Sequence, residues 1–309
     1  MPASIRVVLG TRGSELALAQ ASLVEKALRS AAPGFEVATQ IINTRGDEHH
    51  PSDPDAGRKG LFTGEIERAL LARIIDIAVH SAKDLPSEST AGLNLAAALP
   101  RAPVNDLFIG KSCSFATLPA GAIVATGSIR RRCQLLSRRS DLRIVDLKGN
   151  VPTRLRKLAS NSWDGIILAR AGVDRLGLLH SSATIQFEMN SFSAEVLDQE
   201  SFLPAGGQGA IVLQVRDDDK RTSELAGRVN DDATLLCLRA EREFLRRLGG
   251  DCDTPVGVLA TIAADSMILR AQIFESEGVP PRTARLQEVM GTNAPEALSA
   301  KLLELINGG

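Results

Sequence analysis

The chain has 309 residues, of which 44% are hydrophobic and 24% charged, and its formal net charge is −1. This length predicts two or three domains, and the absence of any run of about 18 apolar residues argues against a membrane span. Four widely spaced cysteines without a Cys-x-x-Cys pair, together with only four histidines, argue against a metal centre. The N-terminus enters a strand pattern without a secretory leader, so we expect a cytoplasmic protein.

The first hundred residues alternate between strand and helix patterns. We expect strands at residues 5–10, 35–42, 75–79 and 93–99, and helices at residues 15–31 and 61–73. This alternation predicts a largely parallel sheet. A polar run at residues 44–59 is long enough to form a loop or lid.

A second alternation follows the proline-containing segment 100–103. We expect strands at residues 122–125, 142–146 and 165–168, helices at 129–139 and 151–159, and a strand at 211–215 that returns to an earlier sheet. From residue 217 the pattern changes to a helix at 234–248, antiparallel strands at 255–264, 267–274 and 282–289, and a helix at 295–306. This change predicts a small separate domain from residue 217 onward.

Three of the predicted strand-to-helix turns place polar groups and cations at a helix N-terminus. They are residues 10–14, residues 126–128 before Arg130, and residues 148–150 before Arg154. Free backbone N–H groups and guanidiniums at such turns suit a carboxylate or a phosphate. Residues 10–14 match neither a Walker loop nor a dinucleotide fingerprint, and a plain turn explains them equally well.

Basic residues are concentrated in one part of the chain. Residues 126–175 contain twelve Lys and Arg against four Asp and Glu. A solvated helix face accounts for Arg138, Arg139, Arg156 and Lys157. A nucleic-acid footprint is the other alternative, but aromatic content is only 3%, which leaves few platforms for base stacking.

The segment from His80 to Pro86 contains a charged pair that follows an apolar strand in the sequence. Lys83 and Asp84 follow this strand. In an open α/β sheet, ligands bind at the carboxyl ends of the strands, so both side chains would face a cleft. A surface ion pair on a loop is the alternative.

Seven motifs, in this order, resemble the porphobilinogen deaminase family, also called hydroxymethylbilane synthase. They are Thr11-Arg12-Gly13-Ser14, Lys59-Gly60-Leu61-Phe62, His80-Ser81-Ala82-Lys83-Asp84-Leu85-Pro86, Gly127-Ser128-Ile129-Arg130-Arg131, Gly149-Asn150-Val151 with Arg154, Leu203-Pro204-Ala205 with Gly207-Gln208-Gly209-Ala210, and Cys252-x-x-Pro255. The resemblance covers nearly the whole chain.

This resemblance implies an α/β fold with two periplasmic-binding-protein-like domains, built on mainly parallel sheets, plus a small α+β C-terminal domain. Domain 1 would comprise residues 1–98 and 201–216, domain 2 residues 99–200, and domain 3 residues 217–309. The active cleft would lie between domains 1 and 2. Domain 3 would carry a cofactor cysteine on a loop.

The resemblance also implies an activity. The enzyme would condense four porphobilinogen molecules head to tail with release of ammonia, and would hydrolyse the product to hydroxymethylbilane. One dipyrromethane cofactor would be joined by a thioether to Cys252. We expect a monomer whose partner is the small-molecule substrate, with no nucleic acid, membrane or metal.

The resemblance and the basic turns together give a set of site residues. Asp84 would be the catalytic carboxylate, because an anion beside the cation formed on loss of ammonia lowers that barrier. The other cofactor-binding residues would be Lys83, Ser128, Arg130, Arg131, Lys148 and Arg154. The substrate-binding residues would be Arg12, Ser14 and Arg175.

The chain departs from the usual family pattern at several positions. Lys148 and Gly64 stand where the family usually has arginine and lysine, Gly206 replaces a larger residue, and Asp251 replaces the second glycine before the cysteine. Acidic neighbours on both sides make the Cys252 thiol harder to ionise, which suits a one-time attachment point. A solute-binding module of the same architecture would bind an anion without needing Asp84 or Cys252.

Overall fold

The computed structural model describes residues 5–44, 63–180, 183–249, 254–291 and 294–308. The chain divides into two compact units, each made of two chain segments. The first contains Met1–Arg101 and Ala210–Cys252, and the second contains Ala102–Gly209 and Asp253–Gly309. Within the described ranges, every helix is too short or too polar to cross a membrane.

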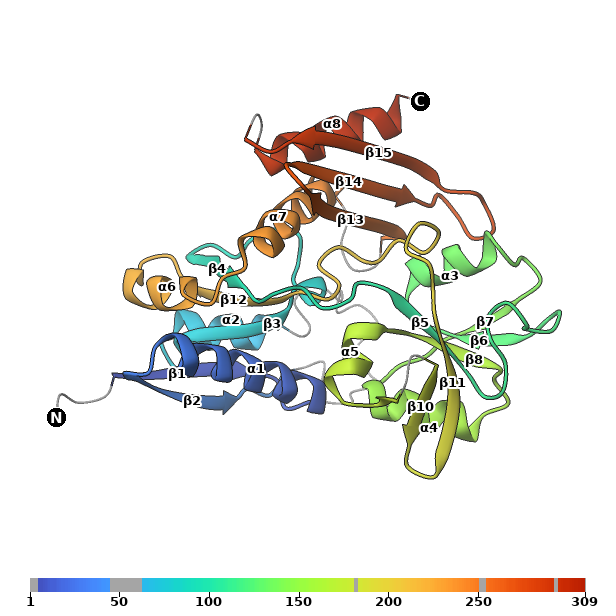
Figure 1. Cartoon of the computed structure of the whole chain (residues 1–309), viewed down its shortest axis with the longest axis horizontal. Coiled ribbons are helices and arrows are strands. Elements are labelled where there is room, and N and C mark those ends of the chain that lie inside the picture. The colour runs from blue at the N-terminus through green and yellow to red at the C-terminus, as the bar shows by residue number, and fades with distance from the viewer. Residues whose placement is uncertain (1–4, 45–62, 181–182, 250–253, 292–293, 309) are drawn as a thin grey trace. The chain divides into compact units, whose positions relative to one another are not determined.

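The first unit is built on a five-stranded sheet with the order β2-β1-β3-β12-β4 (Figure 1). Its strands are β1 (Ile5–Thr11), β2 (Phe35–Ile41), β3 (Ile77–Ser81), β4 (Leu93–Ala98) and β12 (Ile211–Arg216). β1 pairs in parallel with β2 and β3, whereas β12 is antiparallel to both β3 and β4. The predicted strand at residues 211–215 therefore does return to an earlier sheet, and it lies between two of its strands.

Helices cover both faces of this sheet. They are α1 (Glu15–Ala31), α2 (Gly64–Leu71), the short 3₁₀ turn η1 (Ala82–Asp84), α6 (Lys220–Gly227) and α7 (Asp232–Arg247). Ile77 packs with α1 residues on one face, and its neighbour Ala78 packs with α2 residues on the other, since successive side chains of a strand alternate. Both faces are apolar, which explains the nearly continuous hydrophobic run of β3.

The second unit contains a seven-stranded sheet with the order β7-β6-β8-β5-β11-β10-β9. Its strands are β5 (Asp106–Gly110), β6 (Ile123–Ala125), β7 (Arg143–Val145), β8 (Gly165–Ala169), β9 (Leu179–His180), β10 (Thr184–Phe187) and β11 (Asn190–Val196). Only β7, β6 and β8 run parallel; β5 and the later strands pair antiparallel. The sheet is therefore mixed rather than mainly parallel, because the β9–β11 meander extends it by short turns instead of helical crossovers.

The helices of the second unit begin with polar caps. α3 (Ile129–Leu136) is capped by Ser128 and α4 (Val151–Ser160) by Asn150, whereas α5 (Arg170–Arg175) follows β8 directly. The predicted helix at residues 129–139 ends three residues early, at Leu136. Both capped turns match the predicted anion-binding turns in position.

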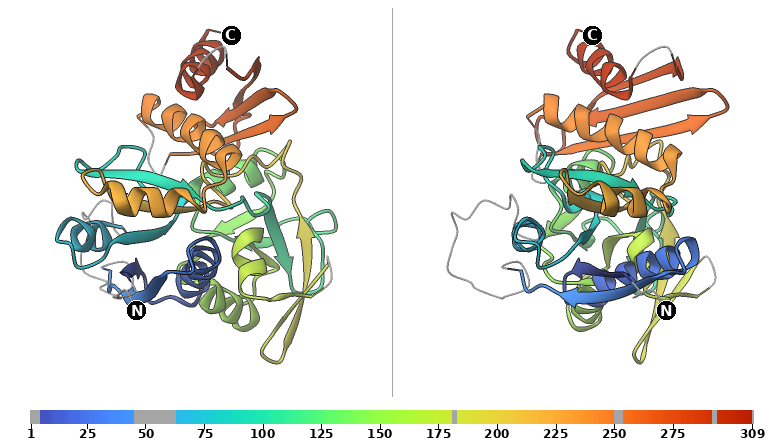
Figure 2. Two further views of the ribbon diagram at one scale, coloured as in Figure 1. Left: turned by 60° about the vertical axis from the view of Figure 1, so that its left-hand side comes forward. Right: turned by 90° about the vertical axis from the view of Figure 1, so that its left-hand side faces the viewer.

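The last part of the second unit is a three-stranded antiparallel sheet with one helix. It comprises β13 (Val256–Ala263), β14 (Ser266–Ile273), β15 (Arg282–Val289) and α8 (Pro295–Asn307), with α8 lying against the sheet (Figure 2). These four elements match the predicted ones to within about two residues. The fold is therefore mixed α/β with a small C-terminal sheet, as the sequence predicts.

Candidate active site

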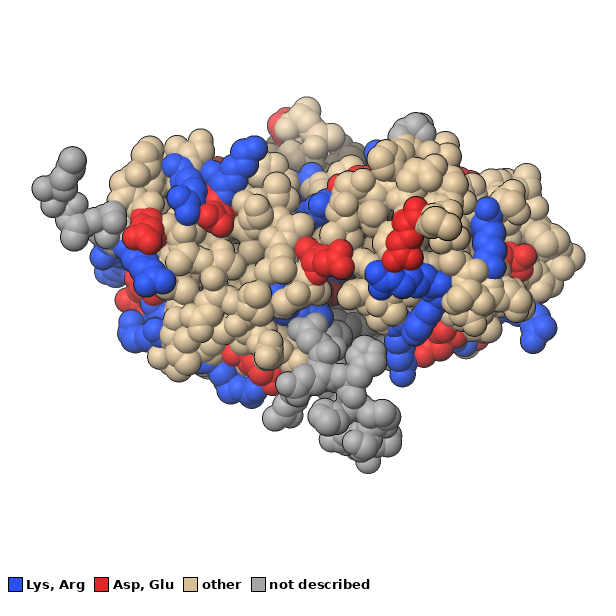
Figure 3. Space-filling model, turned by 90° about the horizontal axis from the view of Figure 1, so that it is seen from below, with Lys and Arg blue, Asp and Glu red and all other residues tan. Residues whose placement is uncertain are grey.

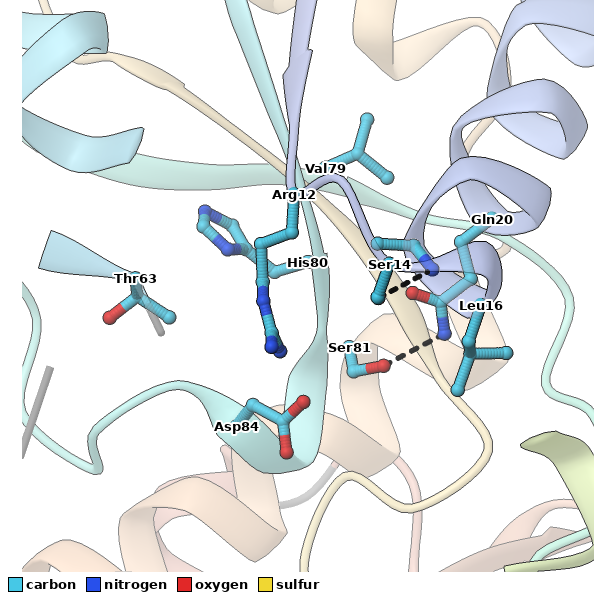
Figure 4. Close-up of a pocket in the computed structure, with 10 residues that line it drawn as sticks. Arg12, Ser14, Leu16, Gln20, Thr63, Val79, His80, Ser81 and Asp84 are labelled. Carbon is cyan, nitrogen blue, oxygen red and sulfur yellow. Dashed lines mark hydrogen bonds between the residues drawn. The ribbon is translucent and has the colours of Figure 1, made fainter. Parts of the chain in front are cut away.

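A pocket opens in the first unit where the carboxyl ends of β1 and β3 meet the N-terminus of α1 (Figure 4). Its lining is mostly polar and consists of Arg12, Ser14, Leu16, Ala17, Gln20, Thr63, Val79, His80, Ser81 and Asp84. Three of the predicted site residues, Arg12, Ser14 and Asp84, thus line one pocket.

Strand register brings Arg12 and Asp84 together. β1 and β3 are parallel neighbours, with Gly10 opposite Ala78, so the residues that follow each strand emerge at the same edge of the sheet. Arg12 follows β1 directly, and Asp84 ends the 3₁₀ turn after β3. Both side chains are half-buried, and Figure 4 shows the guanidinium and the carboxylate directed toward one another.

The α1 end of the pocket is held by capping and by one side-chain hydrogen bond. The Ser14 hydroxyl accepts from the Ala17 amide at 3.3 Å, which starts the helix. The Gln20 amide donates to the Ser81 hydroxyl at 2.8 Å and links α1 to β3. Gln20 and Ser81 were not predicted as site residues. The sequence did hold a signal for Gln20, because a glutamine on the apolar face of a predicted helix needs a polar partner.

Two further lining residues, His80 and Thr63, were also not predicted as site residues. His80 is 4% exposed, and its Nε2 lies 3.1 Å from the Gln214 Oε1 atom. Burial, together with the positive charges of Arg242 and Arg12, lowers the pKa of His80 to about 4, so the ring is neutral at pH 7. The Thr63 hydroxyl is buried and has no hydrogen-bond partner in the part of the chain that the structure describes.

In the second unit, Arg130 and Arg131 share one buried carboxylate. Arg130 Nη2 donates to Asp106 Oδ2 at 2.9 Å, and Arg131 Nη2 donates to Asp106 Oδ1 at 2.8 Å. The Gln208 amide also donates to Asp106 Oδ1, at 2.8 Å. Burial alone would raise the pKa of Asp106, but the two guanidiniums hold it well below its usual range.

This cluster retains donor capacity and positive charge. Arg130 and Arg131 are 3% and 5% exposed, and their Nε atoms have no hydrogen-bond partner among the described residues. Two cations face one anion, which leaves one net positive charge in a buried environment. Such a donor set fits an additional carboxylate, because buried charges are normally paired.

The other predicted cofactor residues lie around the helix starts. Ser128 caps α3 by accepting from the Arg131 amide at 3.5 Å, and Arg154 Nε donates to the Gly149 carbonyl at 2.7 Å. Lys148 is exposed, and its Nζ lies 3.8 Å from Asp146 Oδ2. Lys83 is half-buried in η1. Each of these residues thus sits at a helix start or in a 3₁₀ turn, where the sequence predicts anion-binding groups.

Arg175 binds backbone in the second unit. Its Nη2 donates to the Gly209 carbonyl at 2.6 Å, which connects α5 to the glycine-rich segment before β12. Burial lowers the pKa of Arg175 to about 10, and the side chain stays charged at pH 7.

The remaining basic residues of segment 126–175 do not gather into one free patch. Arg139 pairs with Asp141 and Arg156 with Glu188, both at 2.7 Å, and the Arg138 guanidinium lies 4.9 Å from the centroid of the Phe202 ring. Figure 3 likewise shows basic side chains beside acidic ones on the face it draws. This distribution favours the solvated-face interpretation over a nucleic-acid footprint.

Cys252 and the motif Lys59-Gly60-Leu61-Phe62 lie outside the described residues. Of the other cysteines, Cys133 and Cys237 are buried within α3 and α7, and Cys113 is half-buried. Burial raises the pKa of all three thiols, to about 12 for Cys237. In the described ranges no group of three His, Cys, Asp or Glu side chains is placed to hold a metal ion.

Comparison with known proteins identifies the family. The family model "Porphobilinogen deaminase, dipyromethane cofactor binding domain" matches residues 7–224, and the model "Porphobilinogen deaminase, C-terminal domain" matches residues 235–307. The chain belongs to the porphobilinogen deaminase family. Its two family domains together span nearly all of the described residues.

Relatives named porphobilinogen deaminase match along most of their length. The protein from Roseiflexus sp. (strain RS-1) is 42% identical over 306 residues, which are 98% of this chain and 96% of that protein. The protein from a strain of Thermus thermophilus is 43% identical over 263 residues, 85% of this chain and 82% of that protein. Among solved structures, the methionine binding protein MetQ is 15% identical, covering 74% of this chain and 92% of that chain, with a TM-score of 0.46.

The family implies a dipyrromethane cofactor, and the second unit suits such a group. A dipyrromethane made from two porphobilinogen units carries an acetate and a propionate on each ring. The Arg130–Arg131–Asp106 cluster has one unbalanced positive charge and two unpartnered Nε–H groups among the described residues. These residues therefore fit a group that bears several carboxylates.

Proposed function

We propose that this protein is a hydroxymethylbilane synthase of tetrapyrrole biosynthesis. It condenses four porphobilinogen molecules head to tail, releases one ammonia for each, and adds water to free the linear tetrapyrrole. The observation that carries this proposal is the pocket in which Arg12 and Asp84 face one another at adjacent strand ends, in a chain of the porphobilinogen deaminase family.

Asp84 acts on the carbon that loses ammonia. When the C–N bond of the aminomethyl group breaks, the electron pair leaves with nitrogen and a cationic azafulvene remains. A carboxylate beside this cation stabilises it, and the carboxyl group also delivers a proton to the leaving amine. Asp84 is half-buried, so its charge is less screened than that of a fully exposed group.

Arginines and hydroxyl groups hold the acidic side chains of the substrate. Arg12 and Ser14 sit at the N-terminus of α1, where the positive end of the helix also favours an anion. Arg175 supplies a further cation from α5. A cleft rich in cations opposes the azafulvene, and Asp84 offsets that field where the cation forms.

The cofactor is bound mainly by the second unit in this proposal. When bound, the dipyrromethane would supply a nucleophilic pyrrole carbon. Its carboxylates would be held by Arg130, Arg131, Arg154, Lys148, Ser128 and Lys83, and Cys252 would carry it through a thioether. Lysine at position 148 offers a single point-charge contact where the usual arginine makes a bidentate one.

We also propose that the enzyme works as a monomer in the cytoplasm, with porphobilinogen as its only partner. Light scattering after size-exclusion chromatography would test the monomer. A mass twice that of the chain would contradict it.

Replacing the carboxylate tests the proposed function. Asp84→Asn keeps the size of the side chain but removes its charge and its transferable proton, so we expect turnover to fall at least about a hundredfold. Ammonia release from porphobilinogen in a single turnover is the measurement, with cofactor content checked by intact mass.

Asp217→Asn is the matched control, because Asp217 is an exposed aspartate of the same unit. This variant should keep the wild-type rate. A wild-type rate of ammonia release in Asp84→Asn would remove Asp84 from the mechanism and leave Lys83 and Asp84 as a surface pair.

A further inference from the structure

A buried chain of hydrogen bonds runs behind the pocket and ends at His80. His80 Nε2 lies 3.1 Å from Gln214 Oε1, Gln214 Nε2 donates to Glu67 Oε1 at 2.9 Å, and Thr90 Oγ1 donates to Glu67 Oε2 at 2.9 Å. His80, Gln214 and Glu67 are 4%, 4% and 8% exposed. They come from β3, β12 and α2, three neighbouring elements of the first unit.

The direction of these hydrogen bonds determines where the His80 proton lies. The Glu67 carboxylate accepts from both neighbours, so Gln214 must turn its amide NH₂ toward Glu67 and its carbonyl oxygen toward His80. A carbonyl oxygen only accepts, and His80 must therefore donate from Nε2. A neutral imidazole has one N–H, which leaves Nδ1 of His80 as a bare acceptor.

Burial and the neighbouring positive charges keep the His80 imidazole neutral. Arg12 lies after β1 and Arg242 lies on α7, and both disfavour a charged imidazole. Glu67 reaches the ring only through Gln214, and Asp84 lines the same pocket. Burial is the largest effect and lowers the pKa of His80 to about 4.

The bare nitrogen belongs to a ring that lines the pocket. His80 shares this lining with Arg12 and Asp84, and Figure 4 draws its imidazole beside the Arg12 side chain. Within the described part of the chain, Gln214 is the one side chain that hydrogen-bonds the His80 ring, through Nε2. Arg12 only donates hydrogen bonds. The His80 ring therefore adds a neutral nitrogen acceptor to a pocket whose other acceptors are the Asp84 carboxylate, the hydroxyls of Ser14, Ser81 and Thr63, and the amide oxygen of Gln20.

We propose that His80 is a further substrate-binding residue, whose Nδ1 accepts a hydrogen bond from an N–H group of the pyrrole substrate. Gln214 and Glu67 are positioning residues, since they act by fixing the tautomer of His80. This proposal rests on the proposed function for the identity of the substrate, because porphobilinogen offers N–H donors on its pyrrole ring and on its amine. A neutral acceptor binds these donors without adding a second negative charge beside Asp84.

One variant removes the proposed acceptor atom, and a second serves as its control. His80→Gln keeps an amide that can donate to Gln214 in place of Nε2 but has no atom in place of Nδ1. We expect kcat/KM for porphobilinogen to fall about two- to tenfold, the range for a lost hydrogen bond between uncharged groups. His180→Gln is the matched control, because His180 is the exposed histidine of β9, and it should keep the wild-type value.

Glu67→Gln tests the positioning role. An amide at position 67 can donate to Gln214, which allows Gln214 to turn over and present its NH₂ to His80 Nε2. The His80 proton would then move to Nδ1, and the acceptor would be lost while the imidazole stays in place. We expect a similar fall in kcat/KM together with a reversed tautomer, which a purely structural role of Glu67 would not produce.

The tautomer can be read directly by nitrogen NMR of the cofactor-loaded enzyme labelled with ¹⁵N-histidine. The chain has four histidines, and His80→Gln identifies the His80 signals by their loss. At pH 7.5 we expect a protonated Nε2 and a bare Nδ1, and the Nδ1 signal should shift when porphobilinogen is added. A protonated Nδ1, or an unchanged kcat/KM in His80→Gln, would overturn the proposal. Absence of porphobilinogen turnover in the wild type would instead contradict the proposed function, whatever tautomer the spectrum gives.

Discussion

At the scale of single residues, the pocket combines groups that a sequence can suggest with groups that only the fold brings together. Arg12, Ser14 and Asp84 follow predicted strands or start a predicted helix, so their positions are readable from local patterns. The link from His80 to Gln214 joins positions 134 residues apart. It depends on the antiparallel register of β12 against β3, which no local pattern fixes. Sequence reasoning therefore found the charged residues of the pocket and missed the neutral hydrogen-bond chain behind it.

The buried imidazole predicts a pH dependence of stability. The pKa of His80 is about 4 in the folded protein, against an ordinary value of 6.5, so the unfolded chain takes up the proton first as the pH falls. The contribution of neutral His80 to the free energy of unfolding is therefore fully present above about pH 6.5. It decreases as the pH falls to about 4, by a total on the order of 3 kcal/mol. Arg12 and Arg242 add to this loss, because both repel a protonated ring.

Thermal unfolding of the wild type and His80→Gln at pH 7.5 and pH 4.5 checks this expectation. The wild type should lose more of its Tm between the two pH values than His80→Gln does, and His180→Gln should behave like the wild type. Equal losses in all three proteins would assign the acid sensitivity to other groups.

At the scale of elements, the alternating strands and helices of each unit and the antiparallel strands β12 to β15 were predicted, whereas β5 and β9 to β11 were not. β5 begins with a buried aspartate and follows a proline-containing segment, and β9 has only two residues. Neither shows the apolar alternation that marks a strand. β10 and β11 do alternate apolar and polar residues, so these two strands could have been recognised from the sequence. Their pairing is decided by the sheet they join, which is a tertiary effect.

From the buried cluster of Asp106, Arg130 and Arg131 we predict an effect on stability. Asp106→Asn removes the only carboxylate bound to Arg130 and Arg131 among the described residues, and two buried guanidiniums then face one another without an anion. Breaking a buried ion pair by removing one partner costs about 3–5 kcal/mol. We expect a clear loss of the free energy of unfolding and a reduced cofactor content in the purified protein.

Denaturant unfolding followed by far-UV circular dichroism, with intact mass for the cofactor, would measure both effects. Asp141→Asn is the control, since Asp141 also pairs with an arginine of the same unit but at the surface. A stability of Asp106→Asn close to that of Asp141→Asn would contradict the view that one carboxylate balances this cluster.

At the scale of the whole molecule, each compact unit is assembled from two separate chain segments. The divisions fall at residues 101/102, 209/210 and 252/253. The proposed attachment point of the cofactor, Cys252, lies outside the described residues.

Intact-protein mass tests the attachment. We expect the purified wild type to be heavier than its sequence by one dipyrromethane, and Cys252→Ser to lack the added mass and the activity. Cys113→Ser, the control at a half-buried cysteine, should keep both. An unmodified mass in an active wild-type preparation would contradict attachment at Cys252.

The place of β12 in the first sheet has a consequence for the newly synthesised chain. β3 carries His80 and leads to Asp84, but one of its two neighbours in the sheet ends at Arg216, about 130 residues later. At roughly 5–20 residues per second, a ribosome needs on the order of 7–26 seconds to supply that neighbour. During this time the emerging chain has an unpaired apolar edge at β3, which is open to pairing with other chains. The proposed reaction residues that follow β1 and β3 are thus synthesised early, but their sheet is completed only after the chain has reached β12.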